Sequence, residues 1–86
     1  MGSLRFEGVR FIAYPEDHEP CHLHGFYAEI EVIIELRGEP VWEAALSWRA
    51  KAICPPSAKR ADVQYVLRVA AENAEVLIKL WEEAHA

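Results

Sequence analysis

Apolar and polar residues alternate most regularly over residues 22–37. Even-numbered positions hold a histidine followed by apolar residues, and odd-numbered positions hold most of the charged ones. The even set is His24, Phe26, Ala28, Ile30, Val32, Ile34 and Leu36, and the odd set includes Tyr27, Glu29, Glu31, Glu35 and Arg37. Alternation with a period of two is typical of a half-buried β-strand with one solvated face. We therefore predict one strand over residues 22–37, with His24 on the same face as Phe26 and Ile30.

Three further segments complete the predicted fold. Residues 5–14 are rich in β-favouring types and end before Pro15, which has no backbone donor, so they are predicted to form the first strand. Residues 41–48 alternate in the same way and are predicted to form a third strand. Over residues 58–84 the apolar period becomes 3.6, which predicts one long helix. The sequence thus predicts a single α+β domain over residues 1–86, an antiparallel sheet of about three strands packed against a C-terminal helix.

The predicted helix is long for a chain of this size. About 25 helical residues at a rise of 1.5 Å span roughly 37 Å, whereas the diameter of a comparable globule is roughly 31 Å. Val69, Val76 and Ile78 also widen the apolar surface beyond one contact face. Either the helix is kinked or its far side meets another copy of the chain. We favour a homodimer.

Composition narrows the class of protein. The chain is 52% hydrophobic and 27% charged with a net charge of −5, which argues against a disordered chain and against a general coat protein for nucleic acid or anionic membranes. No apolar run approaches the roughly 18–20 residues that a membrane span needs. Cys21 and Cys54 are too few for a zinc ribbon or a disulfide framework. We expect a cytoplasmic protein with reduced thiols and no membrane partner.

The charge is unevenly distributed along the chain. Residues 1–43 carry nine acids and three bases, whereas residues 44–61 carry bases and no acid. These bases are Arg49, Lys51, Lys59 and Arg60. They could contact phosphate, although exposed cations before a helix commonly serve solubility alone. Because this patch is only local, nucleic-acid binding is not the favoured function.

Three of the four histidines lie within Asp17-His18-Glu19-Pro20-Cys21-His22-Leu23-His24. On a strand, His22 and His24 point to the same side and can converge on one divalent, zinc-like ion, with His18 or Asp17 as a third ligand. A water in an open position could then be acidified for hydrolysis. Three other interpretations stay open: acid–base chemistry without a metal, contact with a partner protein, and a structural role at the edge of the core.

Several motifs carry a family resemblance. Arg5-Phe6-x-Gly8-Val9 opens the first strand, and Asp17-His18-x-Pro20-x-His22-x-His24 fills the loop. An acidic alternating segment from Tyr27 to Leu36 follows, and the closing helix contains Leu80-Trp81-Glu82. On these motifs the chain resembles the small bacterial proteins grouped as domain of unknown function 4160. It departs from them at Cys21, where members usually have a second proline, and in a longer stretch between strands and helix.

The resemblance implies a partner protein, because members of that family often look like components of toxin–antitoxin-type gene pairs and have no established activity. We expect a non-enzymatic interaction module of such a pair, homodimeric, with Asp17, His18, His22 and His24 forming the partner or site loop. The alternative is a small metal-dependent hydrolase or nuclease in which His18, His22 and His24 hold the metal. Neither interpretation assigns a catalytic residue.

Overall fold

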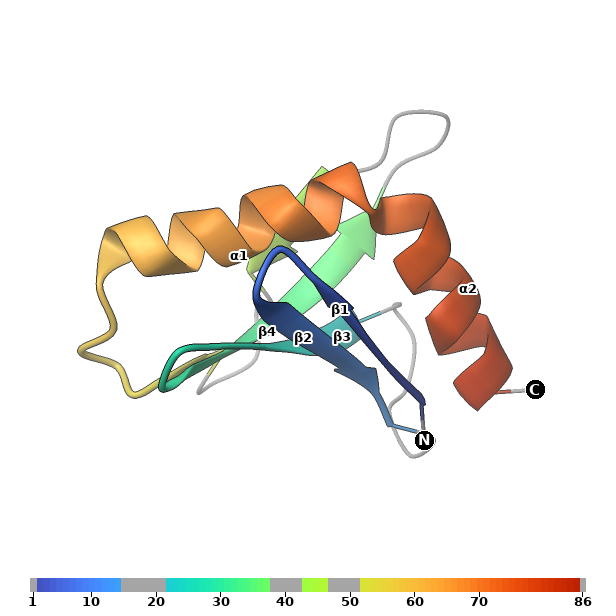
Figure 1. Ribbon diagram of the computed structural model, residues 1–86, viewed down its shortest axis with the longest axis horizontal. Coiled ribbons are helices and arrows are strands. Elements are labelled where there is room, and N and C mark those ends of the chain that lie inside the picture. The colour runs from blue at the N-terminus through green and yellow to red at the C-terminus, as the bar shows by residue number, and fades with distance from the viewer. Residues whose placement is uncertain (1, 15–21, 38–42, 47–51, 86) are drawn as a thin grey trace.

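The computed structural model describes residues 2–14, 22–37, 43–46 and 52–85 of the chain. These residues form a sheet and two helices (Figure 1). The elements are β1 (Gly2–Phe6), β2 (Val9–Ala13), β3 (His22–Tyr27), β4 (Ile30–Arg37), β5 (Glu43–Leu46), β6 (Ile53–Cys54), α1 (Arg60–Glu72) and α2 (Ala74–Ala84). The predicted α+β class is confirmed, whereas the predicted number of strands and the single long helix were imprecise.

β1 and β2 form a hairpin where the sequence predicted one strand over residues 5–14. The chain reverses at Glu7 and Gly8, whose φ angles are 48° and 83°, and Phe6 pairs with Val9 across the turn. Tight hairpin turns of the I′ type need positive φ at both central residues, and glycine adopts it at no steric cost. The single-strand prediction was wrong because Gly8 marks a reversal of the chain.

A second hairpin replaces the single strand predicted over residues 22–37. β3 and β4 are joined at Ala28 and Glu29, and Tyr27 pairs with Ile30 across the turn. Ala28 has a φ of 53°. Directly paired residues share a face, so Ile30 shares its face with Tyr27 and lies opposite to His24. The predicted placement of His24 and Ile30 on one face was therefore wrong.

β4 pairs with three strands, β3, β5 and β6. Its C-terminal half pairs with β5 and its N-terminal half with β6, and all strand pairs are antiparallel in the order β1-β2-β3-β4-β5. The predicted third strand over residues 41–48 is represented by β5, and the other residues of that prediction lie outside the described ranges. β6 was not predicted, because two residues are too short to show an alternation.

The predicted helix over residues 58–84 is broken at Asn73 into α1 and α2. The Asn73 N–H donates to the carbonyls of Val69 and Ala70 at 3.2 Å each, and its side-chain Nδ2 donates to the Val69 carbonyl at 2.9 Å. Asparagine competes with the helical backbone for hydrogen bonds in this way and favours helix ends. Figure 1 shows α2 turned steeply from the axis of α1. The helix therefore follows the sheet, and the overhang predicted for it is absent.

The hydrophobic core lies between the helices and one face of the sheet. The largest fully buried side chains include Phe11, Leu23, Ile34 and Leu77. Gly25 lies in the middle of this contact, because a Cβ atom there would be 2.9 Å from Cγ1 of Val66 on α1 and 3.1 Å from Cδ1 of Ile34. The absence of a side chain at this position lets α1 approach the sheet closely.

Candidate functional site

The register of the strands assigns each strand residue to one of two faces. The inner face packs against the helices and contains, in one row, Phe11, Gly25 and Val32. Side chains of the neighbouring rows point away from the helices, because successive residues of a strand alternate between faces. We call this second side the outer face. Its residues are Ser3, Arg5, Arg10, Ile12, His22, His24, Phe26, Glu31, Ile33 and Glu35.

His24 is held on the outer face by a carboxylate and an aromatic ring. Its Nδ1 lies 2.7 Å from Oε2 of Glu31, in a partly buried contact. An ionised carboxylate can only accept, so Nδ1–H is the donor and the imidazole orientation is fixed. The ring of Tyr14 meets that of His24 edge-on, with centroids 4.8 Å apart. This arrangement positions one imidazole before any ligand is bound.

His22 and Glu35 form the most buried polar pair of the described residues. They lie directly opposite each other on β3 and β4, and their exposed fractions are 2% and 5%. Arg37 Nη2 lies 3.5 Å from Oε1 of Glu35, and neither His22 nor Glu35 lacks a partner. Burying such groups costs free energy unless they are hydrogen-bonded. The partners of His22 and Glu35 therefore compensate for the burial of these two polar side chains.

The structure brings together two of the four residues predicted for the loop site. The rings of His22 and His24 lie with their centroids 6.2 Å apart on the same face, as predicted. Asp17 and His18 lie outside the described residues. Within the described ranges, no three histidine, cysteine or carboxylate side chains are grouped so that they could hold a metal ion. Metal binding that includes His18 stays a prediction.

The basic segment is described only in part. Arg49 and Lys51 lie outside the described residues, whereas Lys59 and Arg60 are exposed at the start of α1. Lys59 borders an open hollow of about 470 Å³, which Glu29 and Asp62 also line. These carboxylates oppose the binding of an anion in the hollow. Contact of the four basic residues with phosphate stays a prediction.

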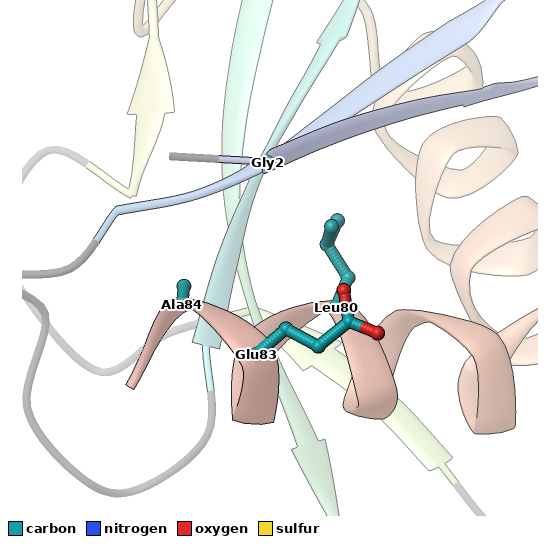
Figure 2. A pocket seen from close by; sticks show the side chains of 4 residues that line it. All are labelled: Gly2, Leu80, Glu83 and Ala84. Atoms are coloured by element: carbon teal, nitrogen blue, oxygen red, sulfur yellow. The ribbon is translucent and has the colours of Figure 1, made fainter. Parts of the chain in front are cut away.

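A second hollow separates the start of β1 from the end of α2. Figure 2 shows Leu80 and Glu83 beside Gly2, with Ala84 at the end of the helix, around a space of about 230 Å³. Among the described residues that line it, Glu83 is the only charged one. A ligand site needs several convergent polar groups, so this hollow is a gap in the packing of α2 against β1.

Sequence reasoning missed the two glutamates that accompany the histidines. Glu31 and Glu35 were assigned to a solvated face opposite to His24, because the turn at Ala28 was not recognised. Glu35 is in fact buried. The signal that could have found them is the pairing of a hairpin, which places Glu31 diagonally across from His24 and Glu35 directly opposite to His22.

The chain was compared with protein-family models, curated proteins and solved structures, and no match was found in any of the three. The resemblance to domain of unknown function 4160 stays a prediction. Among the described residues, neither helix has the length and apolar character that crossing a membrane would require.

Proposed function

We propose that this chain is a non-enzymatic interaction module that binds a partner protein through the outer face of its sheet. The observation that carries this proposal is the imidazole of His24, which Glu31 holds in a fixed orientation on that face. Protein interfaces combine ordered polar groups of this kind with aromatic anchors. Tyr14 and Phe26, both half-buried, provide such anchors beside the histidines.

A toxin–antitoxin-like pair is the setting that the family resemblance suggests for this module. The outer face is consistent with a protein partner, since an imidazole bound to a carboxylate can exchange hydrogen bonds with a second surface. The net charge of −5 does not favour nucleic acid as the partner. The site loop proposed for contact contains Asp17, His18, His22 and His24.

Capture of the partner by purified full-length chain tests the proposal. The immobilised chain would be incubated with lysate of its source cells, and a captured protein would be purified and titrated against variants in solution. We expect Phe26→Ala and His24→Ala to raise the Kd at least about tenfold, as loss of an interface anchor does. Val76→Ala is the matched control, because Val76 is an exposed apolar residue on α2 (46% exposed). Equal affinities for all variants would contradict the proposal.

A homodimer is the second assembly that we propose for testing. The break at Asn73 removes the overhang from which it was predicted, and Val76 and Leu46 are the large apolar residues left exposed in the described part of the chain. Light scattering coupled to size exclusion distinguishes a chain of 9.8 kDa from one of twice that mass. A measured mass of 9.8 kDa at high protein concentration would exclude the homodimer.

A metal-dependent hydrolase is the alternative function. The bond from His24 Nδ1 to Glu31 favours it, because histidines that bind metals commonly donate their other nitrogen to a carboxylate. His18, His22 and His24 would hold the ion, and the basic residues near Lys59 would contact a phosphate. We expect Zn²⁺ titration of untagged protein to show uptake that His22→Ala and His24→Ala abolish. Wild-type protein that takes up no metal would exclude this alternative.

A further inference from the structure

Two arginines face each other on the outer face of the sheet. Arg5 on β1 and Arg10 on β2 are directly paired, and both are exposed. Among the described residues, neither guanidinium takes part in an ion pair. Like charges directly opposite one another on a sheet are destabilising. Phe26 follows Arg10 in the same row and separates it from Glu31, which is bound to His24.

The hairpin places Arg5 and Arg10 in the pair geometry in which side chains lie closest, so the repulsion between their charges is strong. Phe6 and Val9 flank the turn at Glu7 and Gly8, so they form the hydrogen-bonded pair closest to it. Bonded and non-bonded pairs alternate along antiparallel strands, and side chains are closer in the non-bonded ones. Arg5 and Arg10 form the first non-bonded pair. The two arginines therefore concentrate positive charge on the outer face next to the edge of the sheet.

The same geometry turns backbone groups of β1 outwards. β1 is the end strand of the sheet and, among the described strands, it pairs with β2 alone. In a non-bonded pair the N–H and C=O groups point away from the neighbouring strand, so those of Ser3 and Arg5 face the free edge. An extended segment could add to this edge as a further strand. The inner-face residues Leu4 and Phe6 are half-buried at the same edge.

We propose that the β1 edge binds an extended acidic segment of the partner protein, as a strand paired with Ser3 and Arg5. This inference rests on the proposed function and adds the partner's chemistry to it. A carboxylate opposite Arg5 would lie beside the Arg5 guanidinium, on the side away from Arg10, and apolar residues on either side of it would meet Leu4 and Phe6. A second copy of β1 does not fit, because Gly2–Phe6 contains no acid.

Titration with designed peptides tests the edge directly. The probe is an eight-residue peptide that alternates valine with glutamate, and the control replaces each glutamate by glutamine. Amide chemical shifts of full-length ¹⁵N-labelled chain would be followed up to millimolar peptide. We expect shifts at Ser3 and Arg5 with the glutamate peptide, and at least about tenfold weaker binding of the glutamine peptide, as loss of a charge-assisted bond implies.

Variants separate the contributions of charge and backbone. Arg5→Gln should weaken binding about tenfold, and Arg10→Gln should weaken it less because Arg10 lies one strand further from the edge. Arg68→Gln should not weaken it, since Arg68 is exposed on α1 beside the ring of Tyr65. Ser3→Pro removes an outward N–H without breaking a bond to β2, and it should abolish binding. The proposal would be overturned if the amide chemical shifts of Ser3 and Arg5 did not change or if both peptides bound equally well. An equal loss of affinity in Arg68→Gln would overturn it too.

The captured partner distinguishes this inference from the proposed function. Loss of the partner in Phe26→Ala but full retention in Ser3→Pro and Arg5→Gln would overturn the edge proposal and leave the outer face as the binding site. Concentration-dependent dimers that Ser3→Pro abolishes would show a second copy at the edge, and this too would overturn the proposal. Loss of partner binding in Phe26→Ala and also in Ser3→Pro and Arg5→Gln would support the edge proposal.

Discussion

The two faces of the sheet come from the same strands but bury side chains of different chemistry. On the inner face, Phe11, Leu23 and Ile34 are fully buried against apolar residues of the helices. On the outer face, His22 and Glu35 reach nearly the same burial although both are polar. Apolar burial stabilises by roughly 25 cal/mol per Å², whereas burial of an ionisable group needs compensating bonds. The inner face is thus stabilised by apolar burial, whereas the buried side chains of the outer face depend on polar contacts such as that of Glu35 with Arg37.

Under the proposed function, this difference marks the outer face as the place of the binding residues. Polar groups that are costly to bury, and that a hydrophobic side chain of similar size could replace, are commonly associated with function. His24, ordered by Glu31 and Tyr14, belongs to the same group. Substitutions on the inner face should therefore change stability, and substitutions on the outer face should change binding.

The largest contrast is expected between two phenylalanines on neighbouring strands. Phe11→Ala empties a fully buried inner position and should lower the free energy of unfolding by about 3–5 kcal/mol. Phe26→Ala acts on a half-buried outer position and should cost no more than about 1.5 kcal/mol. Urea denaturation followed by circular dichroism measures both. Similar losses in the two variants would contradict the distinction between the faces.

The close contact of α1 with the sheet predicts a smaller but specific effect. Gly25→Ala places a methyl group 2.9 Å from Cγ1 of Val66 and should cost about 1–3 kcal/mol through overpacking. In a Val66→Ala background the same change should cost less, so the double-mutant cycle should show coupling. Ser3→Ala on the outer face is the control and should change stability by at most about 0.5 kcal/mol. If the stability changes of Gly25→Ala and Val66→Ala were additive, Val66 would not be the residue that limits the approach of α1 to the sheet.

On the outer face, a small stability effect is expected at the bond to His24. Glu31→Gln replaces a carboxylate bound at 2.7 Å whose side chain is 35% exposed, so the loss should stay near 0.5–1 kcal/mol at about this exposure. Imidazole ¹⁵N shifts of His24 should change as well, because the acceptor of Nδ1–H is altered. Glu29→Gln, at an exposed turn position, should change neither quantity. Equal effects of both variants would contradict a specific role of the bond.

Periodicity alone predicted the α+β class and the regions of strand and helix. It failed where one residue decides the path of the chain. The apolar stripe continues through Asn73, so the side chain that ends α1 by binding the Val69 carbonyl gave no signal in the pattern. The predicted overhang, and with it the argument for a homodimer, depended on that residue.

The candidate site was predicted in part for a similar reason. His22 and His24 were recognised because strand neighbours two positions apart share a face, and the structure places them together. Their acidic partners depend on the register between β3 and β4, which is set by the turn at Ala28. Neither alanine nor glutamate is typical of a tight hairpin turn, so Glu31 and Glu35 could not be assigned to the histidines from sequence.

The turn at Ala28 gives an equally small expected effect, of opposite sign to that of Glu31→Gln. Ala28 has a φ of 53°, a conformation that costs roughly 1–2 kcal/mol for a residue with a Cβ atom. Ala28→Gly removes this cost but adds freedom to the unfolded chain, so stability should rise by only about 0.5–1 kcal/mol. Ala44→Gly, the same change inside β5, should instead lower stability by about 0.5–1 kcal/mol. If Ala28→Gly also lowered it, the turn would not hold Ala28 in this conformation.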